Sequence, residues 1–172
     1  MKQDQTPVFS HTVNQTMSHI DKDLNPTMVD VSEKKQTLRM ASARSVILFP
    51  EEVMKCVQGN DIQSPKGSVI HTAIVGGTQA VKKTWELIPF CHPLMIESIK
   101  FSFQFKDNEL ILECTVKNTG KTGVEMEALT GASVAALIVY DMCKAMSHNI
   151  IITQTVLLVK QGGKSDVCFS SL

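Results

Sequence analysis

The sequence has few aromatic residues and no excess charge of either sign. Aromatic side chains make up 5% of the 172 residues, with a single tryptophan and a single tyrosine. Lysine plus arginine and aspartate plus glutamate number 17 each, so no overall field attracts a nucleic acid or an anionic membrane. Any anion that the protein binds must therefore be held by a local cluster of cations.

Paired cysteines and long apolar runs are also missing. The five cysteines are odd in number and contain no Cys-x-x-Cys pair, which excludes a disulfide framework. No apolar leader is present, and no run approaches the roughly 20 apolar residues that span a membrane. We therefore expect a cytoplasmic protein that binds neither membranes nor nucleic acids.

Two short runs resemble the end of a P-loop but lack its first glycine. They are GKT at residues 120–122 and GKS at residues 163–165. The P-loop pattern needs a glycine five positions before its Gly-Lys pair, and the chain has Thr115 and Leu158 there. A P-loop nucleotide site is excluded.

The chain is apolar enough to form one core, with 43% hydrophobic residues. We expect a single domain over residues 27–166. Residues 1–26 are mostly polar and are predicted to form a flexible N-terminal tail, and residues 167–172 a C-terminal tail.

Apolar patterning predicts the order strand, helix, strand, strand, helix, strand. A short helix that begins at residue 51 and is stopped by Gly59 and Asn60 is expected after the first strand. Ser68 is a plausible N-cap of the first long helix, and Pro89 is its expected stop. Asp107-Asn108 is a plausible hairpin turn. The main elements are predicted at residues 39–49, 68–88, 97–106, 109–117, 126–146 and 150–160. This order is typical of an α+β, ferredoxin-like β-α-β-β-α-β fold, an antiparallel sheet with the helices on one face.

Asp141 and Lys144 are three residues apart in the second long helix, so both project from one helix face. Taken alone, they are typical of an ordinary surface ion pair near a helix end. The surrounding motifs favour a functional interpretation.

Several motifs occur together in the order and spacing of one family. They are MVDVS with TLRMASA, IPFCHPL, KTGVEMEAL, YDMCKA and KQGGKS. From about Met28 to Ser165 the chain resembles the MoaC family of molybdenum cofactor biosynthesis. The resemblance implies a lyase that converts 3′,8-cyclo-7,8-dihydro-GTP into cyclic pyranopterin monophosphate and releases pyrophosphate. It also implies no cofactor, and a homohexamer built as a trimer of dimers with active sites between subunits.

The resemblance implies three catalytic residues, Lys66, Asp141 and Lys144. Without it, Lys66 would be interpreted as a solvated loop lysine. Two neighbouring lysines lower each other's pKa, so we expect amines suited to proton transfer, with Asp141 to orient or relay protons.

The substrate-binding residues implied by the resemblance are Phe90, Cys91, His92, Glu125, Met126, Glu127, Arg39, Lys160 and Lys164. Of these, Glu127 is the first candidate to bind the amidine edge of a guanine-derived substrate, and the cations would bind phosphate. Alternatively His92 lies in the core, the two glutamates cap the helix, and the cations are solvated. Zinc is not expected at Cys91 and His92, because no second ligand pair has suitable spacing.

Two positions depart from the family pattern. Ile74 stands where the family usually has arginine, and Asp166 follows GGKS where glycine is usual.

Two other function classes stay open: a non-catalytic nucleotide- or pterin-binding module, and an RNA binder that stacks bases on Phe101, Phe103 and Phe105.

Overall fold

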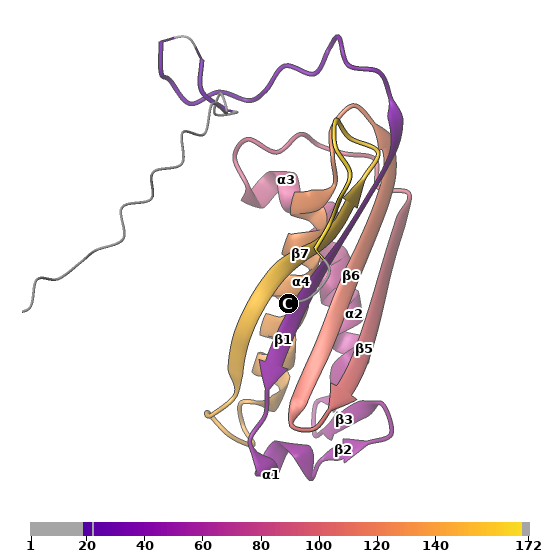
Figure 1. Cartoon of the computed structure of the whole chain (residues 1–172). Coiled ribbons are helices and arrows are strands. Elements are labelled where there is room, and N and C mark those ends of the chain that lie inside the picture. Colours follow the sequence, from indigo (N-terminus) through magenta and orange to yellow (C-terminus); the bar gives the residue numbers. More distant parts are fainter. Residues whose placement is uncertain (1–18, 22, 170–172) are drawn as a thin grey trace, which may run out of the picture.

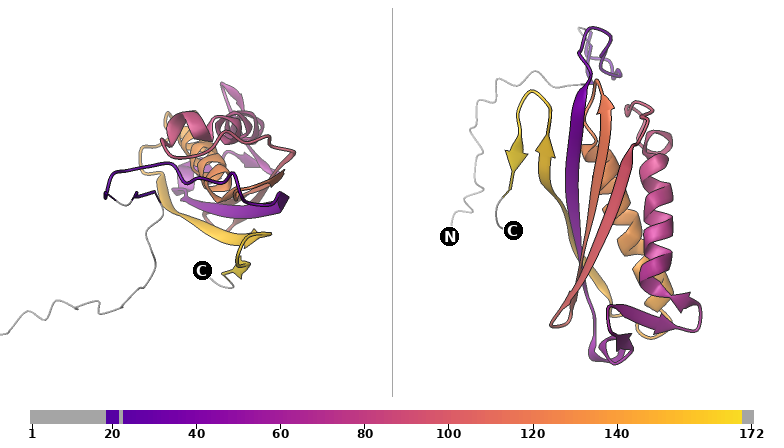
Figure 2. Two further views of the ribbon diagram at one scale, coloured as in Figure 1. Left: turned by 90° about the horizontal axis from the view of Figure 1, so that it is seen from above. Right: turned by 90° about the vertical axis from the view of Figure 1, so that its right-hand side faces the viewer.

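The computed structural model describes residues 19–21 and 23–169. A five-stranded antiparallel sheet is covered on one face by two long helices (Figures 1 and 2). The sheet strands are β1 (Thr37–Leu48), β5 (Ser98–Lys106), β6 (Glu109–Gly120), β7 (Ile151–Gln161) and β8 (Val167–Cys168). The long helices are α2 (Val69–Lys82) and α4 (Glu125–Cys143). Two short helices, α1 (Glu51–Met54) and α3 (Thr84–Leu87), and a small sheet of β2 (Val57–Gln58), β3 (Asp61–Ser64) and β4 (Gly67–Ser68) complete the described chain.

The strand order β5-β6-β1-β7-β8 gives the sheet its topology. The first four strands pair antiparallel, and α2 and α4 connect β1 to β5 and β6 to β7. This arrangement confirms the predicted ferredoxin-like fold. Strand β8 pairs with the outer edge of β7, so the expected C-terminal tail begins with two residues of the sheet.

The first long helix is shorter than predicted. The Ser68 hydroxyl accepts a hydrogen bond from the His71 N–H at 3.1 Å, which confirms the expected N-cap. The predicted end at Pro89 is wrong, because α2 ends at Lys82 and α3 follows after Lys83. The buried Thr84 hydroxyl donates to the carbonyls of Ala80 and Val81, and so satisfies groups that a continuing helix would bond.

The short helix predicted between residue 51 and the stop at Gly59 and Asn60 is mostly wrong. Only the first turn is helical, and Val57–Gln58 then pairs with β3. Gly59 has φ 61°, a left-handed conformation that suits glycine and turns the chain between these strands.

The phenylalanines of β5 face the helices rather than solvent. Phe101, Phe103 and Phe105 are half-buried against the core, and Phe101 contacts α2 at Gly77. They offer no open stacking platform, so the RNA-binding alternative loses its basis. Helix α2 contacts this strand and covers part of its apolar face.

Helix α4 lies against the sheet and α2 through small side chains. Its buried face includes Ala128, Gly131, Ala132, Ala135 and Ala136. Contrary to expectation, α4 is long and apolar enough to cross a membrane. Half of that segment is buried inside the protein, which is the pattern of a core helix.

Candidate functional site

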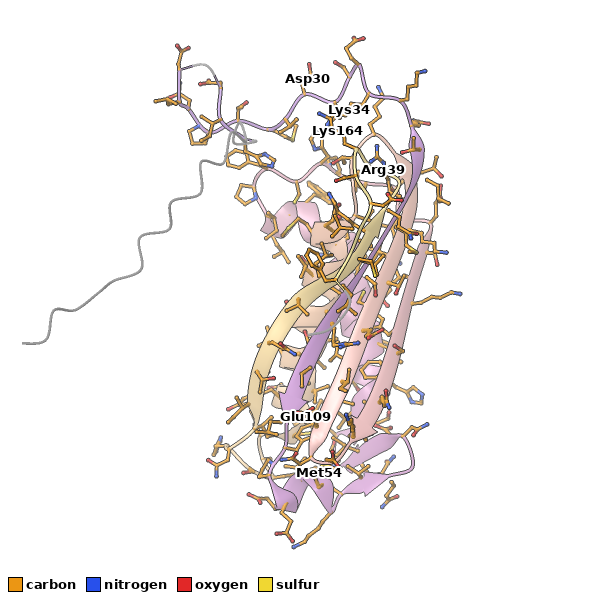
Figure 3. All side chains as sticks on the ribbon, in the orientation of Figure 1. Asp30, Lys34, Arg39, Met54, Glu109 and Lys164 are labelled. Carbon is orange, nitrogen blue, oxygen red and sulfur yellow. The ribbon has the colours of Figure 1, made fainter. Side chains whose placement is uncertain are left out.

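A cavity of about 540 Å³ opens at the N-terminal end of α4. Its wall combines the segment before β1, the loop after α3, the approach to α4 and the turn after β7. All nine residues that the resemblance implied for substrate binding line this cavity: Arg39, Phe90, Cys91, His92, Glu125, Met126, Glu127, Lys160 and Lys164. Figure 3 shows Arg39 and Lys164 at this end of the molecule, opposite Glu109 and Met54.

Among the residues that the structure describes, five lysine and arginine side chains line the cavity, and two of them were missed by sequence reasoning. Lys34 and Lys121 join Arg39, Lys160 and Lys164. The Lys121 amine donates to the Ser32 carbonyl at 2.5 Å, which fastens the segment before β1 to the loop after β6. Lys34 lies two residues after the MVDVS motif, and Lys121 lies in the GKT run and begins the KTGVEMEAL motif. A cluster of this kind attracts an anionic ligand although the chain is neutral overall.

Glu125 and Glu127 occupy the first turn of α4 but have different environments. Glu125 forms an ion pair with Lys160 at 3.5 Å. Glu127 is 4% exposed, and burial raises its pKa from 4.5 to about 7, with a smaller contribution from the Glu125 charge. Near neutral pH Glu127 is therefore divided between its neutral and ionised forms.

Cys91 and His92 follow α3 on the loop that forms one side of the cavity. Burial, and secondarily the neighbouring Glu127, raises the pKa of the Cys91 thiol. Cys91 is thus a neutral wall residue at pH 7 rather than a reactive thiolate. Within residues 19–21 and 23–169, no group of three or more His, Cys, Asp or Glu side chains could hold a metal ion.

The three residues proposed as catalytic form a second cluster. The Lys144 amine lies 2.6 Å from one Asp141 carboxylate oxygen, and the Lys66 amine lies 3.6 Å from the other. Lys66 reaches Asp141 from the turn between β3 and β4, where Gly67 has φ 104°. All three side chains are about half exposed.

The expected lowering of the lysine pKa by a like charge is wrong for Lys144. Its pKa is raised, chiefly by its hydrogen bond to Asp141. The same hydrogen bond is the main reason that the pKa of Asp141 is lowered. The carboxylate between the two amines outweighs their mutual repulsion, and it keeps Lys144 charged.

The cavity and the Lys66–Asp141–Lys144 cluster lie at opposite ends of α4. Glu127 and Asp141 are fourteen positions apart in one helix, which corresponds to about 21 Å along its axis. The N-terminal end of α4 faces the cavity, and its C-terminal end faces the small sheet of β2, β3 and β4 (Figure 1). Within one chain, the Lys66–Asp141–Lys144 cluster and the cavity do not meet.

The two positions that depart from the family pattern have structural roles. Ile74 is half-buried on α2 and packs against the core. The Asp166 carboxylate accepts a hydrogen bond from the Gly162 N–H at 2.8 Å and so closes the turn that carries Lys164.

Comparison with known proteins gives one consistent result. Residues 28–163 match the MoaC family. A cyclic pyranopterin monophosphate synthase of Xanthomonas campestris pv. campestris (strain 8004) is 50% identical over 157 residues, 91% of this chain and 95% of its own. The Brevibacillus brevis protein of the same name is 51% identical over 150 residues, 87% of this chain and 92% of its own. A molybdenum cofactor biosynthesis bifunctional protein of Synechocystis is 49% identical over 155 residues, 87% of this chain and 45% of its own. The chain belongs to the MoaC family.

Proposed function

We propose that this protein is a cyclic pyranopterin monophosphate synthase of molybdenum cofactor biosynthesis. It is a lyase that converts 3′,8-cyclo-7,8-dihydro-GTP into cyclic pyranopterin monophosphate with release of pyrophosphate. The observation that carries the proposal is the similarity to synthases over nearly their whole length, at about half of all positions. The cationic cavity supports it.

The cavity suits a guanine-derived triphosphate. Arg39, Lys160 and Lys164 contribute positive charge for the phosphate oxygens, and Phe90 and Met126 contribute apolar surface for the ring system. A guanine-like edge offers two N–H donors, and the ionised Glu127 accepts both. Because these donors favour the charged form, substrate binding lowers the pKa of Glu127 from its raised value.

Lys66, Asp141 and Lys144 supply the acid, base and charge needed for the rearrangement. Lys144 stays protonated beside Asp141, so it can donate a proton or stabilise the departing pyrophosphate. Lys66 faces the same carboxylate from a separate turn, which places two amines around one acceptor. These are the roles that we propose for the cluster.

The complete site is assembled from two subunits. A cavity and a catalytic cluster at opposite ends of one rigid helix can act on one substrate only if a second copy supplies the missing half. Exposed apolar side chains on the helical face, including Val75 at 65% and Leu137 at 57%, are suited to such contacts. We propose the homohexamer, a trimer of dimers, that the family resemblance implies.

We also propose that the enzyme acts in the cytoplasm on this small-molecule substrate. All five cysteines lie within the described residues and are free, as is usual in a reducing compartment.

A turnover assay with the cyclised GTP substrate tests the activity. Pyrophosphate and the oxidised, fluorescent pterin are measured for the wild type and for Lys66→Ala, with Lys55→Ala as the control. Lys55 is an exposed lysine paired only with Glu51. We expect product from the wild type and the control but not from Lys66→Ala. A folded wild type that releases no product would exclude the synthase.

Mixing two inactive variants tests the shared site. Lys66→Ala damages the catalytic cluster and Glu127→Gln damages the cavity. In a mixed dimer, one site carries both defects and the other carries neither, so random mixing should restore about a quarter of wild-type activity. Activity that stays at the level of the separate variants would show that each chain completes its own site.

A further inference from the structure

His19 forms part of the cavity wall although it lies outside the residues that match the family, 28–163. Its ring stacks on Phe90, with ring centroids 5.8 Å apart and planes inclined by 25°. This spacing leaves no room for a substrate ring between them. Phe90 therefore supports the imidazole, and both rings belong to the cavity wall.

A small loop fastens His19 in this position. The Asp21 carboxylate accepts hydrogen bonds from the N–H groups of Asp23 and Asn25, both at 2.9 Å. The Asp21 N–H donates to the Asn25 carbonyl at 2.9 Å, and the Thr27 N–H donates to the His19 carbonyl at 2.9 Å. Hydrogen bonds thus join the two ends of the loop, at His19 and Thr27, and also hold Asp21 to Asn25 within it.

The backbone of His19 supports a specific placement. Its φ of 73° lies in the left-handed region, which residues other than glycine rarely adopt. Such a conformation persists only where neighbouring interactions hold it, and it is frequent at binding sites. Here the interactions are the loop hydrogen bonds and the stacking on Phe90.

From this geometry we infer that His19 is a further substrate-binding residue, whose imidazole N–H donates a hydrogen bond to a phosphate oxygen of the substrate. The inference rests on the proposed function, because the substrate there is a nucleotide triphosphate derivative. The cations lining the same cavity attract the anionic groups of the substrate into it. Asp21 is a positioning residue that acts through His19.

Three variants of the full chain test the role of His19. His19→Ala removes the ring, His19→Phe keeps a stacking ring without the N–H, and Leu24→Ala changes an 81% exposed side chain of the same loop. The KM and kcat for the cyclised substrate are measured, together with the Kd for GTP by calorimetry. We expect His19→Ala and His19→Phe to raise KM and Kd about tenfold with kcat nearly unchanged, because one charge-assisted hydrogen bond is lost. Leu24→Ala should match the wild type.

Unchanged KM and Kd in His19→Ala would overturn the inference, as would full binding by His19→Phe. If the wild type binds GTP but does not turn over the cyclised substrate, the proposed function fails, and the GTP measurements still decide the role of His19. Asp21→Ala should weaken binding as His19→Ala does, and the double variant should be no weaker than His19→Ala. Additive losses would show that Asp21 does not act through His19.

Discussion

The Glu125 carboxylate lies 3.5 Å from the Lys160 amine and joins the first turn of α4 to β7 at the wall of the cavity. Both side chains are about one-third exposed. A phosphate that enters the cavity competes with Glu125 for this amine. The ion pair therefore sets how strongly Lys160 attracts the substrate.

Replacement of Lys160 by methionine should weaken substrate binding. It should also make the KM less dependent on salt concentration. We expect KM to rise about tenfold with a small change in kcat, since a charge-assisted contact is lost. The wild-type KM should rise with ionic strength, and that of Lys160→Met should rise less steeply. Lys82→Met, an exposed change on α2, is the control. Equal salt dependence in Lys160→Met and the wild type would contradict the phosphate role.

Replacement of Glu127 by glutamine should stabilise the protein at alkaline pH. The folded pKa of about 7 exceeds the ordinary 4.5, so the folded state binds more protons between these values and loses stability as the pH rises. Above pH 7 the buried charge costs folding about 3 kcal/mol, by the linkage of pKa to stability. The glutamine variant avoids this loss. Urea unfolding at pH 5 and pH 8 measures the difference, and an equal effect at both pH values would refute it.

Replacement of Asp141 by asparagine should lower the pKa of Lys144. The hydrogen bond and charge of Asp141 are the main causes of its raised pKa, and both are weakened in the variant. An NMR titration of the lysine side chains measures this without reference to activity. A Lys144 pKa that does not move would show that Asp141 does not keep the amine charged.

Replacement of Gly77 by alanine should destabilise the fold. An added Cβ would lie 2.6 Å from the Phe101 ring and 3.2 Å from Ala135. We expect a net loss of about 1–2 kcal/mol, because overpacking exceeds the gain in helix propensity. Adding Phe101→Leu to Gly77→Ala should lessen the loss, which chemical denaturation would detect as non-additivity. Gln79→Ala, at an exposed position of α2, is the control, and strictly additive losses would argue against the clash.

Local sequence patterns were enough to predict the principal elements. Alternation in β5 and β6, the turn at Asp107 and the cap at Ser68 are short-range signals, and the structure contains each of them. The end of α2 was missed because Thr84 satisfies helix carbonyls through its hydroxyl once buried, whereas Pro89 gave a stronger but misplaced signal. The strands β2 and β4 are only two residues long and are too short for a periodic pattern.

The site was only partly predictable for a different reason. The substrate-binding candidates came from motif resemblance. Lys121 was given no binding role although it begins the KTGVEMEAL motif, and His19 lay in a segment expected to be a tail. Their positions depend on hydrogen bonds formed in the folded chain, such as that of Lys121 to Ser32. The separation of Glu127 from Asp141 was implicit in helix geometry, but the position of the cavity at the N-terminal end of α4 was not.

Because α4 is one uninterrupted helix, the number of residues between Glu127 and Asp141 fixes the distance between these two side chains along the helix axis. A residue inserted between Glu127 and Asp141 would move the distal carboxylate by about 1.5 Å along the axis and rotate it by about 100° around it. Side chains on its exposed face, such as Leu137, can vary without this effect. Insertions and deletions accepted during evolution should therefore fall in the loops and spare this helix.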